Sequence, residues 1–196
     1  MGSTRFLGLD ISAKSTGVTI LDRDDLTGRL SLVYVTHIDI PASVGYGTNK
    51  TSFTDGQRLA ILNDSLYEIL DRFNPQVFIK EGLGANMNKF RSVSLVSKAT
   101  GVVERVCQSW WGKEPLEIHA YPPMTIKKEV TGSGKADKEE VMKAIFTLFG
   151  TEHYSFVLSK RKGDTEKRPY FNDDETDSTA AIITHFRKNN IKFKTS

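Results

Sequence analysis

Phe6-Leu7-Gly8-Leu9-Asp10 and Gly17-Val18-Thr19-Ile20-Leu21-Asp22 predict two β-strands, over residues 5–10 and 17–22, because both are short apolar runs rich in strand-forming residues. The small residues between them indicate a turn. A third strand is predicted over residues 30–40, where apolar side chains partly alternate with polar ones. Three strands joined by short turns favour an antiparallel meander, with the carboxylate of Asp10 at the end of its first strand.

The rest of the chain alternates helical and strand-like patterns. Residues 41–53 contain two glycines and read as a flexible connection. Helices are predicted where apolar residues recur at three- and four-residue spacing, and strands where short apolar runs end at polar residues. The helices cover residues 54–73, 92–111, 137–149 and 174–188, and the strands cover residues 76–81 and 115–120. Residues 151–173 read as a long polar loop. This order predicts one α/β domain over residues 1–196, in which helices cover a mixed five-stranded sheet.

Several helix ends carry local signals. Thr54 or Asp55 can cap the first helix. Asp137 begins another helix with Glu140 as the reciprocal partner of a capping box, and Gly150 ends that helix.

The composition fits a globular protein that works inside the cell. With 38% hydrophobic and 26% charged residues, the 196-residue chain has enough apolar side chains for a core. No apolar run approaches the roughly 18 residues that a membrane span requires, and the first residues lead into a strand rather than a secretory signal. The single cysteine, Cys107, excludes an internal disulfide and a cysteine-based zinc site. We therefore expect an intracellular, cytoplasmic protein that does not bind a membrane.

Four carboxylates stand in local contexts that can bring them together. Asp10 and Glu81 each end a predicted strand, and Asp174 and Asp177 lie one turn apart at the start of the last helix. Like charges repel at short range, so such a cluster is stable only when cations neutralise it. Oxygen ligands suit Mg²⁺ or Mn²⁺, and two ions about 3.5–4 Å apart can cut a phosphodiester. The sequence therefore predicts a two-metal nuclease site, with Asp10 as the ligand shared by both ions.

Each acid has a simpler explanation when it is considered alone. Asp174 or Asp177 can cap its helix, and Asp10 can be an exposed turn residue. Glu81 is harder to explain in this way, because a carboxylate that ends a buried strand usually needs a cationic partner. The four acids together favour the metal site.

Basic residues are unevenly placed although the net charge is only +3. Residues 127–138 hold four lysines around Gly132-Ser133-Gly134, where glycines allow the backbone to approach a phosphate closely. A flexible loop explains the glycines equally well, and the Walker A pattern is absent. Clustered positive charge suits a polyanionic partner. DNA contacts are predicted for Lys127, Lys128, Lys135, Lys138, Lys160, Arg161 and Lys162.

These motifs together resemble the RuvC family of Holliday-junction resolvases, within the RNase H-like superfamily. The matching pieces are Leu7-Gly8-Leu9-Asp10, Ser15-Thr16-Gly17, Glu81, the lysines and glycines of residues 127–138, and Asp174-x-x-Asp177 followed by Ala180, Ala181 and His185. The resemblance implies an RNase H-like fold and a catalytic tetrad of Asp10, Glu81, Asp174 and Asp177. It also implies DNA and scissile-phosphate contacts by Lys127 and Lys138, so Lys138 is a further catalytic candidate. The family acts as a homodimer that makes paired nicks across a four-way junction and leaves ligatable 5′-phosphate ends.

The chain also departs from the family pattern. The family typically has a base-stacking aromatic just after its catalytic glutamate, whereas this chain has Gly82-Leu83-Gly84-Ala85, with Phe90 as a substitute candidate. The segments 41–53 and 151–173 look longer than in bacterial members, which suggests a phage or viral version acting in the cytoplasm of a bacterial host.

Two other functions stay open, and one is disfavoured. The chain can instead be an RNase H-like nuclease for other branched DNA, flaps or RNA-containing substrates, or a junction-binding protein without catalysis. An actin-like ATPase would need a second lobe for which the chain has no room. We expect His185 to pack rather than bind metal, Trp110 and Trp111 to anchor a helix end, and the helix over residues 92–111 to form the dimer contact.

Overall fold

The protein is described by a computed structural model over residues 2–12, 14–45, 50–82, 90–112, 114–159 and 165–195, with the backbone alone for residues 90–92. Its main sheet has the strand order β3-β2-β1-β6-β7. The bounds are β1 Ser3–Ile11, β2 Ser15–Asp24, β3 Leu30–Asp39, β6 Val77–Glu81 and β7 Ile118–Tyr121. β1, β2 and β3 are antiparallel neighbours, and β6 and β7 run parallel to β1. The predicted fold class, a mixed five-stranded sheet with three antiparallel strands followed by parallel ones, is confirmed.

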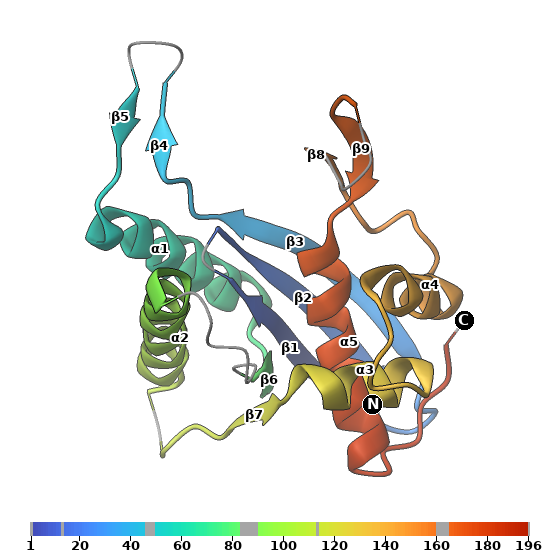
Figure 1. Ribbon diagram of the computed structural model, residues 1–196. Helices are drawn as coiled ribbons and strands as arrows, with labels where there is room; N and C mark the ends of the chain where they lie inside the picture. The colour runs from blue at the N-terminus through green and yellow to red at the C-terminus, as the bar shows by residue number, and fades with distance from the viewer. Residues whose placement is uncertain are drawn as a thin grey trace.

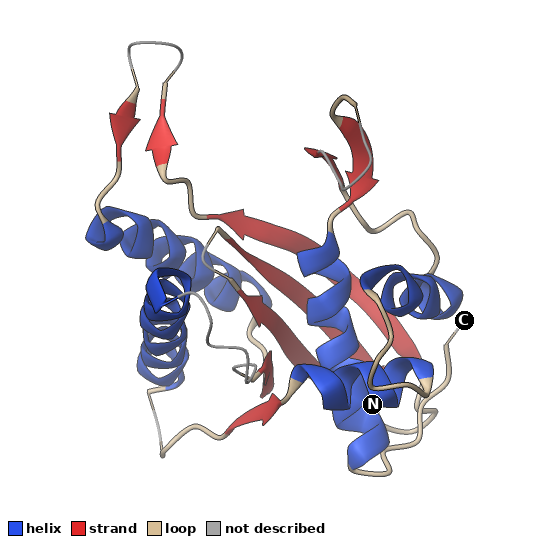
Figure 2. Cartoon of the chain, in the orientation of Figure 1, coloured by secondary structure: helices blue, strands red, loops and turns tan. Residues whose placement is uncertain are grey.

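Different helices cover the two faces of this sheet, which forms the central layer in Figures 1 and 2. Along β1 the side chains alternate, so Leu7 and Leu9 pack on one face and Phe6 packs on the other. α1 (Asp55–Phe73) and α2 (Phe90–Trp111) cover the face of Leu7 and Leu9. α3 (Pro123–Thr131), α4 (Lys138–Phe149) and α5 (Asp173–Lys188) cover the opposite face.

The helix ends follow the expected chemistry. Thr54 caps α1 through a capping box with Gln57, and Asp137 caps α4 through a capping box with Glu140. Gly150 ends α4 with a positive φ of 78°. These caps satisfy backbone groups that a helix end leaves without partners, so the sequence signals for these helices are confirmed.

Two segments predicted as loops contain short hairpins. β4 (Ser43–Val44) pairs with β5 (Thr51–Ser52), and β8 (Phe156–Ser159) pairs with β9 (Arg168–Phe171). The prediction of a long polar loop over residues 151–173 is therefore wrong. The strands of these hairpins show no alternation of apolar and polar residues. β9 is instead fixed by a tertiary contact between Phe171 and Phe146 of α4, whose ring centroids are 4.7 Å apart.

Helix α3 is a further difference from the sequence prediction. Its residues were expected to belong to a connection, but Pro123 to Thr131 form nine residues of helix with a proline in the first turn and Gly132 at the C-cap, φ 85°. Ile126 and Val130 are its buried positions. Two buried apolar residues are too few to show helical periodicity in the sequence. The helix is stabilised mainly by its packing against α5, which the local sequence does not indicate.

None of the helices among the described residues is sufficiently long and apolar to cross a membrane.

Candidate active site

Adjacent strands β1 and β6 bring the first two acids together. Leu9 pairs with Lys80 in parallel register, so Asp10 and Glu81 are the next neighbours along the two strands. Side-chain alternation decides which face they occupy. Phe6 and Ile79 pack on the α5 side, and Asp10 and Glu81 have the same parity along their strands. Lys80 therefore faces the other way, where its Nζ lies 2.6 Å from Oε1 of Glu104 on α2.

Helix α5 brings the second pair of acids to the same place because two glycines allow it to lie directly on the sheet. A Cβ atom at Gly17 would overlap the backbone carbonyl of Asp174, and one at Gly8 would overlap that of Ser178. Thr19 of β2 adds hydroxyl contacts of 2.7 and 2.8 Å to Ser178 and Thr179. The start of α5 therefore lies against the end of β1 and the beginning of β2.

The capping interpretation of these acids does not hold. The N-cap of α5 is Asn172, whose side-chain oxygen accepts from the backbone N–H of Asp174 at 2.9 Å. Asp174 and Asp177 both lie inside the first turns of the helix, so neither carboxylate is used as the N-cap. Negative charge is nevertheless favoured at this helix end by the backbone dipole.

All four acids line one cavity of about 360 Å³. Lys127 of α3 and Lys138 of α4 line it as well, together with Ser12 of the β1–β2 turn. Lys138 Nζ lies 3.2 Å from Asp173 and 4.0 Å from Asp177. The structure therefore brings together five of the predicted site residues, Asp10, Glu81, Asp174, Asp177 and Lys138, with Lys127 beside them.

Other predicted DNA contacts are not brought to this cavity. Lys128 and Lys135 are exposed and lie outside its lining. Lys160, Arg161 and Lys162 lie outside the described residues, as do residues 83–85 and the side chain of Phe90. Their roles stay predictions.

The carboxylates carry strongly perturbed acidities. Burial, followed by the charges of Glu81, Asp177 and Asp174, raises the pKa of Asp10 well above its ordinary value. Burial and Asp177 raise the pKa of Glu81 to about 7. Burial also raises the pKa of Asp177 to about 6, although Lys138 acts in the opposite direction. The charged forms of these acids are therefore disfavoured, and the two lysines that line the cavity offset only part of the burial and of the mutual repulsion.

Lys138 is the cation most closely coupled to these acids. Burial alone would lower the pKa of its ammonium group, but the charges of Asp177 and Asp173 reverse this effect and leave the pKa raised. Lys138 therefore stays protonated beside the acid cavity and offsets part of its negative charge.

The donor set suits a hard divalent cation, but the carboxylates are not yet arranged around one. Within the described ranges, no three His, Cys, Asp or Glu side chains form a group that could hold a metal ion. The carboxylate of Asp174 instead accepts a hydrogen bond from the hydroxyl of Ser15. Because this hydrogen bond is to Oδ2, the other carboxylate oxygen of Asp174, Oδ1, can still serve as a ligand. Four carboxylate groups lining one cavity are nevertheless the ligand chemistry that Mg²⁺ and Mn²⁺ prefer.

Comparison with known proteins identifies the family. The family model described as crossover junction endodeoxyribonuclease RuvC matches residues 6–153. The chain belongs to the RuvC family. RuvC of Xanthobacter autotrophicus is 30% identical over 186 residues, which cover 94% of this chain and 90% of the relative. RuvC of Orientia tsutsugamushi strain Boryong is 30% identical over 166 residues, 84% of this chain and 91% of the relative.

Solved structures agree on the fold of the RuvC family. T. thermophilus RuvC, solved in complex with a Holliday junction substrate, has a TM-score of 0.67 at 18% identity, with 96% of both chains covered. The yeast mitochondrial Holliday junction resolvase Ydc2 has a TM-score of 0.61 at 15% identity, with 96% of this chain and 80% of that chain covered. The resemblance predicted from the sequence motifs is thereby confirmed, whereas a phage or viral origin stays a prediction.

Three residues near the RuvC-type acids were not predicted from the sequence. Ser15 binds Asp174, Asp173 pairs with Lys138, and Glu175 is buried in the first turn of α5. Glu175 accepts hydrogen bonds from the backbone and hydroxyl of Ser155, at 2.7 and 2.6 Å, and its Oε1 lies 2.8 Å from Nδ1 of His37. An acidic run before an apolar helix was the only available signal, and it does not distinguish these roles.

The remaining sequence expectations concern packing. His185 is buried, its Nδ1 lies 3.0 Å from the Tyr121 hydroxyl, and burial lowers its pKa to about 4. It does not line the acid cavity. Trp110 and Trp111 pack against the core on the α1 and α2 side, and Trp110 Nε1 donates to Asp71 at 2.8 Å. Both predicted packing roles agree with the structure.

Proposed function

We propose that this RuvC-family protein is a metal-dependent endonuclease that resolves four-way DNA junctions by paired nicks and leaves 5′-phosphate and 3′-hydroxyl ends. The observation that carries the proposal is the convergence of Asp10, Glu81, Asp174 and Asp177 on one cavity. Residues so far apart in sequence gain nothing structurally from mutual repulsion. Perturbed carboxylates gathered in a cavity are a common mark of a catalytic site.

In this proposal the four carboxylates hold two Mg²⁺ ions, for which Mn²⁺ can substitute, and Asp10 is shared between them. When bound, the ions supply an activated water for in-line attack and stabilise the leaving 3′ oxygen. Glu81 and the α5 pair hold the site from opposite sides, because they come from β6 and from the helix that covers the sheet. Ion binding would favour the charged forms of these acids, whose pKa values are raised first by burial and then by the neighbouring carboxylates.

Lys138 is proposed to contact the scissile phosphate. Its ammonium group already lies between Asp173 and Asp177 at the cavity. An incoming phosphate oxygen offers the same chemistry as a carboxylate oxygen, so Lys138 can exchange partners when DNA enters. Lys127, on the facing helix α3, is proposed to neutralise the adjacent phosphate.

Further parts of the proposal concern partners and location. Phosphate contacts away from the cavity are assigned to Lys128, Lys135, Lys160, Arg161 and Lys162. A homodimer is proposed with α2 as the contact, since Gly101 has nothing within 4 Å of a Cβ position and is exposed. We also propose that residues 1–196 act as one nuclease domain in the cytoplasm, in a bacterial host if the protein comes from a phage.

Cleavage of a mobile four-way junction tests the proposal. Wild-type protein with Mg²⁺ is expected to cut the junction in preference to a replication fork or an RNA–DNA hybrid. Asp10→Asn and Asp177→Asn are expected to lose cutting while they keep junction binding, which Asp10→Asn can tighten by reducing repulsion. Asp64→Asn, an exposed aspartate of α1, is the matched control and should cut normally.

The outcomes separate the competing functions. Appreciable cutting by Asp10→Asn would rule out the metal assignment. Preferred cleavage of the hybrid or the fork would favour the other RNase H-like nucleases. Junction binding in EDTA without any nicking in Mg²⁺ or Mn²⁺ would identify a binding protein that lacks catalysis.

A further inference from the structure

We propose that the β8–β9 hairpin is a DNA-binding arm, and that it holds the backbone of the DNA in a groove next to the acid cavity. The inference rests on the proposed function, because it assigns a surface to the same substrate. It is carried by the groove, by the face that the hairpin turns toward it, and by the way the hairpin is anchored.

The groove is continuous with the acid cavity. It has a volume of about 490 Å³ and shares three lining residues, Ser12, Lys138 and Asp174, with the cavity of the four acids. On one side it is bordered by the β1–β2 turn and the end of β3, and on the other by Val157 and Ser159 of β8. A DNA strand whose phosphate reaches the acids therefore has a path along this groove.

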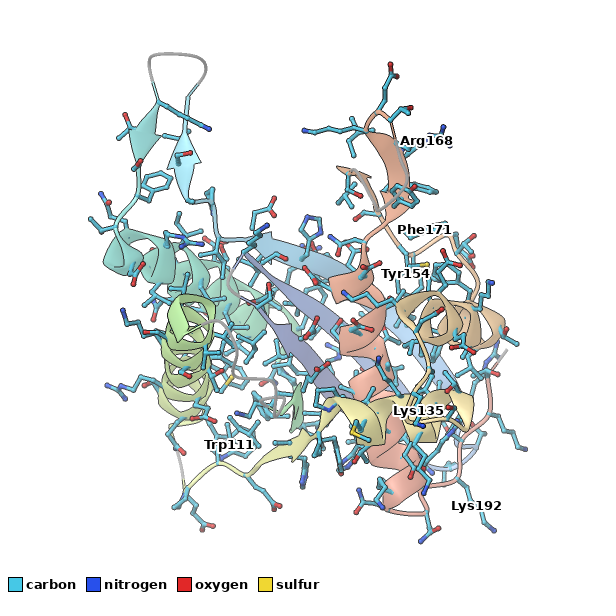
Figure 3. The ribbon with its side chains drawn as sticks, in the orientation of Figure 1. Trp111, Lys135, Tyr154, Arg168, Phe171 and Lys192 are labelled. Carbon is cyan, nitrogen blue, oxygen red and sulfur yellow. The ribbon has the colours of Figure 1, made fainter. Side chains whose placement is uncertain are left out.

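One face of the hairpin is turned toward the groove. Residues that are directly paired in an antiparallel hairpin project from the same face. Val157 pairs with Tyr170, and Ser159 pairs with Arg168. Since Val157 and Ser159 line the groove, Arg168 and Tyr170 belong to the groove side. Figure 3 shows Arg168 near the outer part of the hairpin, with Phe171 nearer its base.

Aromatic residues at the base of the hairpin anchor it to the body of the protein, and one of them, Phe171, also lines the groove. Phe156 stacks on Phe171 with ring centroids 4.1 Å apart, and Phe171 packs edge-on against Phe146 of α4 at 4.7 Å. At the base, the backbone N–H of Asn172 donates to Ser155 at 2.9 Å. An isolated two-stranded hairpin is marginally stable in water, so these contacts are what hold this one beside the groove.

The buried carboxylate of Glu175 adds a second anchor. It joins Ser155, at the base of the hairpin, to His37 of β3, which itself borders the groove. The two walls of the groove are therefore connected through one side chain that is only 1% exposed. This connection fixes the width of the groove before any ligand enters.

The charges favour a polyanion as the occupant. On the described part of the hairpin, Lys167 and Arg168 carry two exposed positive charges beside the single acid Glu166. Lys14 adds a cation on the opposite wall. The acids that border the groove are engaged within the protein: Lys138 contacts Asp173, Ser15 binds Asp174, and His37 Nε2 lies 3.8 Å from Asp39. The DNA backbone is the polyanion that must also reach the acid cavity.

A tethered cleavage reagent tests where the DNA lies. Cys107 is fully buried and burial raises its thiol pKa to about 12, so an introduced cysteine can be labelled selectively. Ser159→Cys in an Asp10→Asn background would be coupled to an iron–EDTA reagent and bound to an end-labelled four-way junction. We expect strand breaks within a few nucleotides of the branch point. Ser31→Cys, exposed at the opposite end of β3, is the matched control and should give none above background.

Loss of charge gives an independent test. Lys167→Ala together with Arg168→Ala is expected to weaken junction binding at least about tenfold and to reduce the slope of log Kd against log salt by about 2. Lys192→Ala with Lys194→Ala removes the same charge at the opposite end of the molecule, where Figure 3 labels Lys192, and should have less than half that effect.

Failure of this inference is distinguishable from failure of the proposed function. If wild-type protein cuts junctions but the Ser159 tether gives no local breaks and the hairpin variant binds normally, the hairpin is not a DNA-binding arm. If the hairpin variant changes the sedimentation coefficient and leaves junction affinity unchanged, the hairpin is an interface between copies and the inference is wrong. If wild-type protein neither binds nor cuts junctions, the proposed function itself fails.

Discussion

Gly17 of β2 lies against the backbone carbonyl of Asp174 so closely that no side chain fits between them. This single approach places the first turn of α5, with two of the four acids, over the end of β1. Gly17 of the sequence motif therefore determines how closely α5 can approach the sheet.

Gly17→Ala is therefore expected to displace the start of α5. Overpacking in a tightly packed interior costs roughly 1–3 kcal/mol, and the free energy of unfolding should fall by at least that amount. Cleavage should fall further, because Asp174 and Asp177 move with the helix. Chemical denaturation and junction cleavage measure the two effects.

Gly56→Ala is the matched control for that variant. Gly56 is an exposed glycine of α1, and the nearest atom to a Cβ built there is the Thr54 hydroxyl at 3.9 Å. Alanine should stabilise the helix by about 1 kcal/mol, and cutting should be unchanged. If both glycine variants lost the same amount of stability and of cleavage, the close approach of α5 to the sheet would not be what determines either quantity.

The acid cavity should make the metal-free protein more stable as the pH falls from about 8 to 5. The pKa of Glu81 is raised to about 7 and that of Asp177 to about 6, above the values of about 4 expected in the unfolded chain. The folded state then binds more protons across this range, so each carboxyl stabilises folding by up to about 1.4 kcal/mol per pH unit as the pH falls. The groups facing Glu81 are Asp10, Asp174, Asp177, Lys127 and Lys138.

His185 acts with the opposite sign, because its lowered pKa of about 4 makes protonation destabilising. The measurement is therefore the difference in melting temperature between wild type and Glu81→Gln, followed in EDTA from pH 8 to pH 5. As the pH falls from 8 to 5, the melting temperature of the wild type should rise relative to that of Glu81→Gln. With saturating Mg²⁺ the gain should disappear, because the ion stabilises the deprotonated folded form. Parallel curves in EDTA would contradict the assigned shifts.

Replacement of Lys138 by Met should lower cleavage by about 10² or more, the usual scale for losing a charge that stabilises the reacting group. Removal of this cation should also raise the pKa of Asp177 further, since Lys138 lowers it in the wild type. The pH profile of cleavage should accordingly shift to higher pH. Lys143→Met, with a side chain 78% exposed on the same helix, is the control and should leave rate and profile unchanged.

Glu175→Ala should cost about 3 kcal/mol of stability, because it removes a buried carboxylate that joins Ser155 to His37 and leaves both without their shared partner. For a chain of this size that corresponds to a fall of roughly 10 °C in melting temperature. Glu152→Ala removes an exposed glutamate near the same hairpin, 70% accessible, and should change stability by no more than about 0.5 kcal/mol.

Much of the fold and of the acid cluster was predictable from local pattern. Apolar runs that end at Asp10 and Glu81 identify neighbouring strand ends, and Asp174 and Asp177 at one-turn spacing identify a helix start. These signals are local and strong. Their convergence follows from the rule that a helix must bury its apolar side on the sheet.

The rest depended on contacts between distant segments. Neither α3 nor the β8–β9 hairpin shows a periodic pattern in the sequence, and Phe146 on α4 fixes the hairpin only in the folded protein. Glu175 reads as one more acid in a polar run, yet it is buried because His37 of β3 and Ser155 face it. Contacts between residues that are distant in the sequence cannot be predicted from the local sequence pattern.

Helix α5 follows every strand of the central sheet in the order of synthesis. On a translating ribosome, the emerging chain holds Asp10 and Glu81 long before Asp174 and Asp177 exist. If the site needs all four acids, no nascent fragment that ends before α5 can carry a complete set of ligands. Cleavage of DNA becomes possible only after α5, the helix that completes the core, has been synthesised.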